Sequence, residues 1–123
     1  MIEPVLQTSL PLDFLRRGKV RDVYSVDAER VLVVATDRIS AFDVVMAEGV
    51  PHKGAVLTQL TAWWLGQLKD PIPHHMLSVD AEEIVRAVPA LAGHEALLRG
   101  RAMLCKRAEV YPIECVMRGF LSG

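Results

Sequence analysis

The chain has 123 residues, of which 51% are hydrophobic and 24% are charged, and its net charge is −1. This length suffices for one compact domain with a buried core but not for two ordinary ones, and the composition is that of a globular protein. The near-zero net charge excludes a general attraction to nucleic acid or to an acidic membrane, so any anion site has to be local.

The first predicted strand covers residues 18–25, within and just after the strongly charged stretch "RGKVRDVY". Alternation places Asp22 and Tyr24 on one face of this strand, and Lys19 and Arg21 on the other. Two interpretations fit the density of positive charge. The segment is either a solvated edge strand or a hairpin that binds phosphate.

A turn and a second strand are predicted next. Residues 26–30, "VDAER", are types that tolerate tight turns, and residues 30–37 are a β-branched run typical of a buried strand. These two strands are expected to form a hairpin. The stretch 39–54 mixes apolar residues with Gly49, Pro51 and Gly54, which are typical of loops.

A helix is predicted from Ala55 to about Lys69, and Pro71 and Pro73 should end it. Its apolar residues recur at three- and four-residue intervals: Leu57, Leu60, Trp64 and Leu68. This spacing predicts one apolar face that packs on the core. Trp63 and Trp64 are therefore interpreted as core residues and not as a stacking platform.

The remaining elements are shorter. We expect a strand near residues 74–79 and a helix that begins after Asp80, with Asp80 as its N-cap and Glu82 and Glu83 in its first turn. Two further strands are predicted at 97–108 and 111–121, joined by a connector around 109–112. The predicted fold class is α+β, a mainly antiparallel sheet with flanking helices.

Several site classes find no support in the sequence. The chain has no GxxxxGK[ST] phosphate loop, and its four histidines lack the partners and spacing of a zinc site. Cys105 and Cys115 lie in separate apolar runs without CxxC spacing, so both are predicted to be reduced, buried thiols of a cytoplasmic protein. No apolar run approaches the roughly 20 residues that span a bilayer, and the N-terminus does not resemble a signal peptide.

Charged residues beside strands and glycines are the candidates that remain. They include Lys19, Arg21, Arg38, Lys53, Lys106, Glu114 and Arg118. Taken singly, each is more often a solvated surface charge than a ligand. Lys106 and Arg118 interrupt or close apolar runs, where a buried charge needs either an anionic ligand or an internal salt bridge.

Four segments occur in a characteristic order: "GKVRDVY", "ATDRISAFDVVM", "GVPHKGAVLTQLTAWWL" and "YPIECVMRGFLSG". Together they resemble the N-terminal part of the phosphoribosylaminoimidazole-succinocarboxamide synthase (SAICAR synthetase) family over residues 12–123. The resemblance implies an ATP-dependent carbon–nitrogen ligase of purine biosynthesis. That enzyme joins L-aspartate to carboxyaminoimidazole ribonucleotide and releases ADP and phosphate. It also implies a nucleotide-binding lobe similar to the small lobe of protein kinases.

The resemblance also implies site residues. A hairpin over the ATP phosphates would be formed by Gly18, Lys19, Val20 and Arg21. Lys106 would point at the phosphates, and the backbone of Glu109, Val110 and Tyr111 would read adenine. This assignment favours the phosphate-binding interpretation of "RGKVRDVY" and leaves Arg16 and Arg17 as surface residues.

For the substrate pocket the resemblance implies Asp37, Ser40 and Lys53 as bordering residues. Arg118 would lie near the phosphate of the ribonucleotide substrate. Glu114 would either support the site or pair with Arg118. The resemblance assigns no catalytic residue and no metal ligand within this chain.

Members of the family are longer, and the acids that hold Mg²⁺ belong to the part that follows. The chain is therefore expected to be an N-terminal ATP-binding lobe, 1–123, that is incomplete for catalysis. Its expected partners are the small-molecule substrates, without nucleic acid or membrane, and a homo-oligomer is left open. Two alternatives remain: another ATP-using enzyme with a kinase-like small lobe, or a non-catalytic module that binds a partner.

Overall fold

We analysed a computed structural model of the chain, which describes residues 2–68, 70 and 72–121. A five-stranded sheet in the order β1-β2-β3-β7-β6 forms the body of the molecule, and all of its neighbouring strands are antiparallel. Its strands are β1 (Asp13–Arg17), β2 (Arg21–Ser25), β3 (Arg30–Ala35), β6 (Met76–Ser78) and β7 (Ala102–Lys106). A separate two-stranded hairpin contains β4 (Arg38–Ala41) and β5 (Val44–Gly49).

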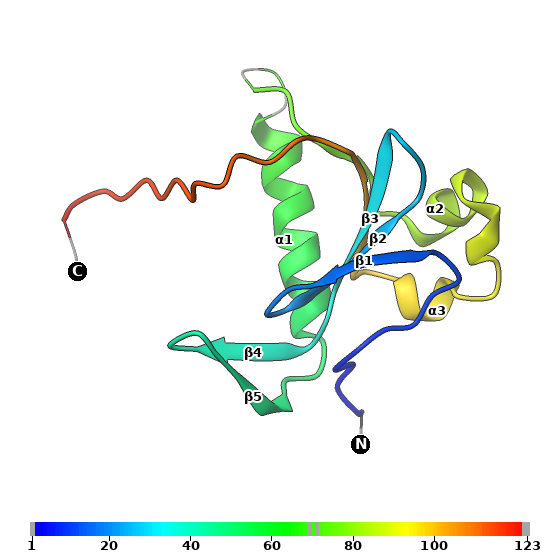
Figure 1. Cartoon of the computed structure of the whole chain (residues 1–123), viewed down its shortest axis with the longest axis horizontal. Helices are drawn as coiled ribbons and strands as arrows, with labels where there is room; N and C mark the ends of the chain where they lie inside the picture. Colours follow the sequence, from blue (N-terminus) through cyan, green and yellow to red (C-terminus); the bar gives the residue numbers. More distant parts are fainter. Residues whose placement is uncertain (1, 69, 71, 122–123) are drawn as a thin grey trace.

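Helices cover both faces of the sheet (Figure 1). On one side lies α1 (Lys53–Leu68), and on the other lie α2 (Ala81–Ala87), the 3₁₀ turn η1 (Pro89–Leu91) and α3 (Glu95–Leu98). The predicted α+β class with a mainly antiparallel sheet and flanking helices is confirmed. Among the described residues, no helix has both the length and the apolar character to cross a membrane.

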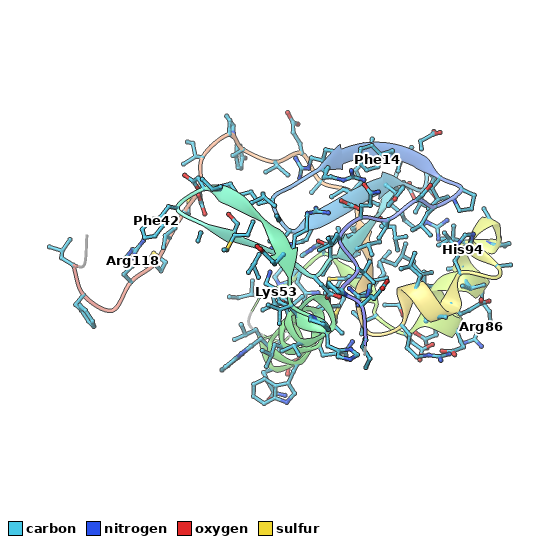
Figure 2. The ribbon with its side chains drawn as sticks, turned by 90° about the horizontal axis from the view of Figure 1, so that it is seen from below. Phe14, Phe42, Lys53, Arg86, His94 and Arg118 are labelled. Carbon is cyan, nitrogen blue, oxygen red and sulfur yellow. The ribbon has the colours of Figure 1, made fainter. Side chains whose placement is uncertain are left out.

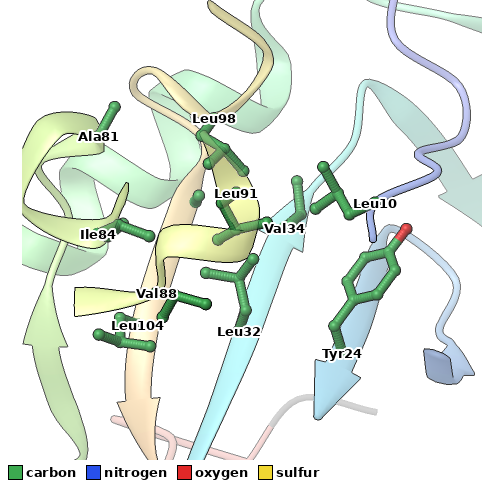
Figure 3. Packing of buried hydrophobic residues seen from close by; sticks show 11 residues of the cluster. Leu10, Tyr24, Leu32, Val34, Ala81, Ile84, Val88, Leu91, Leu98 and Leu104 are labelled. Atoms are coloured by element: carbon green, nitrogen blue, oxygen red, sulfur yellow. The ribbon is translucent and has the colours of Figure 1, made fainter. Parts of the chain in front are cut away.

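The hydrophobic core lies between the sheet and the α2–η1–α3 layer (Figure 3). Pairing of β2, β3 and β7 places Tyr24, Leu32 and Leu104 in one row on this face, where Ile84 and Leu91 pack against them. Leu32, Ile84 and Leu91 are completely buried, and each such side chain contributes about 1.5–3 kcal/mol. The hairpin predicted from 18–25 and 30–37 is present as β2 and β3.

The start of α2 follows the prediction in detail. Asp80 is the N-cap, and its carboxylate accepts a hydrogen bond from the backbone N–H of Glu83 at 2.9 Å. The side chain of Glu83 in turn accepts from the hydroxyl of Ser78 at 2.8 Å. The strand predicted near 74–79 is the short β6.

The apolar face of α1 is the main correction to the sequence analysis. The helix packs on the sheet through Gly54 and Thr58, while its large apolar side chains are exposed. These are Val56, Leu57, Leu60, Trp63, Trp64 and Leu68. The periodicity identified a helix but not what covers its apolar face, so the core assignment of Trp63 and Trp64 was wrong. The helix end predicted at Lys69 lies outside the described residues.

Other boundaries also differ from prediction. The strand that was predicted to begin at residue 18 is β2, which begins only at Arg21. The strand before it, β1, was not predicted. The loop predicted over 39–54 contains the β4–β5 hairpin, whose turn residues Phe42 and Asp43 have positive φ values of 50° and 63°. Residues 95–98 form a short helix at the start of the predicted strand 97–108.

The strand predicted over 111–121 is not formed among the described residues. From Arg107 to Leu121 the chain is irregular and extends away from the body of the molecule (Figure 1). Among the described residues its apolar side chains belong to no strand, and they remain exposed. Cys115 lies here and is exposed, contrary to the prediction, whereas Cys105 on β7 is buried. Burial raises the pKa of the Cys105 thiol to about 12.

Candidate functional site

A large cavity lies on the sheet face opposite the hydrophobic core. It has a volume of about 940 Å³, and its floor includes Val23, Val31 and Val33 from β2 and β3. The rest of its lining comes from β1, the turn after it, the first residue of β2, the residue before β6, and the end of β7 with the segment that follows: Leu15, Arg16, Gly18, Lys19, Val20, Arg21, His75, Lys106, Arg107, Ala108 and Val110. A smaller hollow of about 200 Å³ under α1 shares Val20, Arg21, Val33 and His75 with this cavity.

The rim of the cavity is basic. Arg16, Lys19 and Arg21 lie on one side, Lys106 and Arg107 lie on the other, and no carboxylate is among the lining residues. Five cationic residues around one cavity create a local positive potential, although the chain as a whole is nearly neutral. A cavity with an apolar floor and a cationic rim suits a ligand that has both a flat apolar part and an anionic part.

Most of the residues predicted to bind nucleotide meet in this cavity. Gly18, Lys19 and Val20 form the turn between β1 and β2, which a hydrogen bond from Gly18 N to Arg21 O at 2.7 Å closes. Lys106 at the end of β7 and Val110 contribute from the opposite side. Glu109 and Tyr111 belong to the same segment as Val110, but they are exposed and do not line the cavity.

Lys19 is engaged in the structure by a neighbouring hairpin. Its ammonium group pairs with the carboxylate of Asp43 in the β4–β5 turn, and both side chains are exposed. The hydrogen bond with Asp43 and the charge of Asp43 raise the pKa of Lys19, to which the charge of Glu114 adds. The same pair lowers the pKa of Asp43. A phosphate at Lys19 would therefore compete with a solvent-exposed carboxylate, a weak competitor.

Arg16 and Arg17, predicted as surface residues, have different positions. Arg16 is exposed and lines the cavity. Arg17 points to the other side, where its Nε donates to Asp22 Oδ1 at 3.0 Å and its guanidinium lies 5.4 Å from the centre of the Phe14 ring. Because side chains alternate along β1, these two neighbouring arginines point to opposite faces of the strand. The number of charges in the segment does not show this difference.

Asp37 is buried and its carboxylate is fully engaged by protein groups. Arg101 donates to both of its oxygens, at 3.0 and 3.3 Å, and the backbone N–H groups of Val5 and Gly54 each donate at 2.9 Å. Burial alone would raise the pKa of Asp37, but these hydrogen bonds outweigh it and the net shift is downward. In this structure Asp37 fixes the start of α1 against the ends of β3 and β7.

Lys53 and Ser40, the other residues predicted near the substrate pocket, lie on the adjacent hairpin and helix. Lys53 is the first residue of α1, and its Nζ donates to the carbonyl oxygen of Arg38 at 2.9 Å. Burial lowers the pKa of Lys53, while the charge of Asp37 opposes this effect. Ser40 is exposed on β4, where it pairs with Val45.

Glu114 and Arg118 lie on the extended segment beyond β7, and neither lines the cavity. Both are exposed, and the described part of the chain contains no ion pair between them. Figure 2 shows Arg118 at the same end of the molecule as Phe42, with Arg86 and His94 at the opposite end. The structure therefore brings most of the predicted nucleotide residues to one cavity, whereas the predicted substrate residues are divided: Asp37 and Lys53 lie at the start of α1, and Ser40, Glu114 and Arg118 lie elsewhere.

Metal binding has no counterpart in the described residues. They contain no group of three His, Cys, Asp or Glu side chains that could hold a metal ion. Two cavity residues that sequence reasoning left out are Arg107 and His75. The adjacent "KR" dipeptide at 106–107 was the available signal for Arg107, whereas His75 had none.

Comparisons with known proteins identify the family of the chain. Residues 14–123 match the SAICAR synthetase family. The phosphoribosylaminoimidazole-succinocarboxamide synthase of Thermodesulfovibrio yellowstonii is 47% identical over 97% of this chain. The chain belongs to the SAICAR synthetase family. The synthase of Geobacter metallireducens is 48% identical over the whole chain. In both comparisons the chain spans 40% of the relative's length.

Solved structures of SAICAR synthetase family members share the fold. A structure described as SAICAR synthase has a TM-score of 0.79 and 37% identity and covers 88% of this chain, which spans 38% of that structure. The enzyme from Saccharomyces cerevisiae, in complex with SAICAR, has a TM-score of 0.76 and 38% identity over 84% of this chain and 36% of that one. A type-2 SAICAR synthetase in complex with ADP, 20% identical with a TM-score of 0.59, shares the fold.

Proposed function

We propose that this chain is the N-terminal ATP-binding lobe of a ligase that makes SAICAR from carboxyaminoimidazole ribonucleotide, L-aspartate and ATP. The observation that carries the proposal is the convergence of Gly18, Lys19, Val20, Arg21, Lys106 and Val110 on one cavity with a basic rim. In this proposal the valine floor receives the adenine, and the cations around it receive the phosphates. The backbone of Glu109, Val110 and Tyr111 would read the adenine.

The charges of the cavity fit the chemistry of such a ligase. A carboxylate is a poor electrophile, and transfer of the γ-phosphoryl group of ATP to its oxygen converts it into an acyl phosphate. The aspartate amine then attacks the acyl carbon, and phosphate leaves. Phosphoryl transfer needs positioning and neutralisation of negative charge more than a covalent nucleophile. The lysines and arginines of the rim, with turn amides, would supply that neutralisation.

The other substrates belong to the same proposal. Arg118 would bind the ribonucleotide phosphate, since a planar guanidinium can pair with two oxygens. Ser40, Lys53 and Glu114 would border the substrate, and Asp37 would act from inside the fold through Gly54. Protein ligands for Mg²⁺ bound to ATP would come from the part of the family's length that this chain does not span. A cytoplasmic location is part of the proposal.

A test of the nucleotide site compares two substitutions with a matched control. Lys19→Ala and Lys106→Ala should each weaken ATP binding by roughly tenfold to a hundredfold, since a hydrogen bond to a charged group is worth about 1.5–3 kcal/mol. Arg86→Ala removes an exposed cation on α2, on the other side of the sheet, and should leave the affinity unchanged. Titration calorimetry measures all four proteins. Unchanged affinity in both lysine variants would refute the assignment.

The exposed apolar residues favour a second candidate, a non-catalytic interaction module. Val116, Met117, Phe120 and Leu121 are all largely exposed on the extended segment. Product formation separates the two functions. Mixing the chain with a polypeptide that supplies the remaining part of the family's length, together with all three substrates, should yield SAICAR. The interaction module predicts association of the two polypeptides without product.

A further inference from the structure

A buried arginine holds the turn that carries Lys19. Arg38, the first residue of β4, is 7% exposed. Its guanidinium donates from Nη2 to the carbonyl oxygen of Gly18 at 2.9 Å and from Nε to that of Lys19 at 3.1 Å. It also donates from Nη1 to the carbonyl oxygen of Leu6 at 2.6 Å. One side chain therefore joins the β1–β2 turn to the N-terminal segment.

The carbonyl group of Val20, the next in the turn, is bound on the same side as those of Gly18 and Lys19. The oxygen of Val20 accepts from the backbone N–H of Thr36 at 2.9 Å and from its hydroxyl at 2.8 Å. Three successive carbonyl groups, those of Gly18, Lys19 and Val20, are thus bound by interior donors. In a planar trans peptide the N–H points opposite to the C=O. The N–H groups of Lys19 and Val20 therefore point away from Arg38.

These two N–H groups are available to a ligand. Within the described residues, neither donates a hydrogen bond to a protein acceptor. Arg38 pairs with Asp22, whose side chain lies on the same face of the sheet as Tyr24, the core face. The cavity lies on the opposite face, which carries Arg21 and Val23. Successive backbone N–H groups on one side of a turn are a recurrent way of binding anions.

Asp22 fixes the guanidinium in turn. Its Oδ1 accepts from Arg38 Nη2 at 3.0 Å, and its Oδ2 accepts from the backbone N–H and the hydroxyl of Thr8 at 2.9 and 2.8 Å. Only a guanidinium offers several donors in one rigid plane, so a lysine at this position could not bind the two turn carbonyls, Leu6 and Asp22 together.

We infer that Arg38 is a positioning residue for phosphate binding: it holds the turn carbonyls inward so that the Lys19 and Val20 N–H groups donate to phosphate oxygens. This inference rests on the proposed function, because it takes the cavity as the nucleotide site. The proposed site then contains backbone N–H donors as well as the predicted lysines. The direction of these N–H groups is set by Arg38, which does not line the cavity.

The first measurement uses the parent chain and nuclear magnetic resonance. ATP and inorganic tripolyphosphate should both shift the amide resonances of Lys19 and Val20, whereas adenosine should leave them nearly in place. If neither ATP nor tripolyphosphate binds, the proposed nucleotide site fails and the inference fails with it. If ATP binds while these two resonances do not move, the inference alone is overturned.

The second measurement compares the affinities of ATP and adenosine in two variants. Arg38→Lys should bind ATP about tenfold more weakly and adenosine equally well, because only the phosphate donors lose their orientation. Arg17→Lys changes the other arginine that pairs with Asp22 but touches no turn carbonyl, and should retain both affinities. An equal loss for ATP and adenosine, or no loss for either, would show that Arg38 is only structural. If Arg38→Lys does not fold, the amide shifts of the parent chain decide.

Discussion

Asp22 and Asp37 are carboxylates that the fold buries beside arginines, Arg38 and Arg101 respectively. Burial alone would raise the pKa of each carboxyl, but hydrogen bonds from Thr8, Arg38 and Arg17 to Asp22, and from Arg101, Val5 and Gly54 to Asp37, lower both below the ordinary value of 3.8. The unfolded chain therefore binds protons more tightly at these groups than the folded chain does. Their contribution to stability is complete above pH 3.8 and is lost as the pH falls through the folded pKa values.

The acid sensitivity gives a prediction for Asp22→Asn. At neutral pH the variant should lose about 3–5 kcal/mol of unfolding free energy, because the buried Arg38 charge is left without its partner. Its stability should also fall less steeply in acid than that of the parent, since one shifted carboxyl is gone. Urea unfolding between about pH 2 and pH 7 measures both effects. Asp27→Asn is the comparison variant: hydrogen bonds from Arg30 and Glu29 also lower the pKa of Asp27, but this pair is partly exposed, so its loss should change the acid profile much less than Asp22→Asn does. A parent-like profile in Asp22→Asn would contradict the prediction.

At the scale of elements, the contact of α1 with the sheet depends on one glycine. A Cβ atom on Gly54 would lie 2.4 Å from the carbonyl oxygen of Ala35 and 2.7 Å from that of Thr36. The helix can approach the end of β3 this closely only without a side chain there. The N–H of Gly54 then reaches the carboxylate of Asp37 at 2.9 Å.

Two glycine substitutions in α1 should therefore have opposite effects. Gly54→Ala should destabilise the chain by about 1–3 kcal/mol, because the helix has to move away from backbone atoms. Gly66→Ala has nothing within 4 Å of the new methyl group and should stabilise the helix by about 0.5–1 kcal/mol. Urea unfolding of both variants checks the signs. Equal stability of Gly54→Ala and the parent would mean that α1 lies farther from β3.

The elements that were predicted correctly are those specified by residues close to one another in the sequence. The β-branched run of β3 and the Asp80 cap of α2 each specify their own structure. The β4–β5 hairpin escaped prediction because its turn uses Phe42 and Asp43 at positive φ, where glycine or asparagine is the usual signal. The run 111–121 has strand-forming residues, but a strand also needs a partner edge, and sequence pattern does not show that.

The candidate site, too, has a part that was predicted and a part that was not. The resemblance to a family grouped Gly18–Arg21 with Lys106, and the fold places them around one cavity. The bonds of Arg38 to the Gly18 and Lys19 carbonyls could not be predicted, since they join residues about twenty positions apart through backbone atoms. The burial of Asp37 also depends on distant groups, among them Arg101 and Val5. Contacts of this kind leave no periodic signal in the sequence.

At the scale of the whole molecule, large apolar side chains are exposed along α1. Leu60 is 51% exposed, and Trp63 and Trp64 are each 56% exposed. The rings of the two tryptophans are arranged edge to face, with their centres 4.8 Å apart. A contiguous apolar surface of this kind is unusual on a monomer and is typical of an interaction site. The chain spans 40% of the length of its relatives in Thermodesulfovibrio yellowstonii and Geobacter metallireducens.

We therefore predict that this chain, studied by itself, associates with itself through α1 at concentrations on the order of micromolar and above. Sedimentation velocity should show a sedimentation coefficient that rises with concentration. The double substitution Leu60→Gln and Trp64→Gln should abolish the rise, and it should change the free energy of unfolding by no more than about 0.5 kcal/mol, since neither side chain is part of the core. Ile2→Gln removes an exposed apolar residue outside α1 and should leave the association unchanged. Association that persists in the double variant would place the contact on another surface, such as the apolar residues of 110–121.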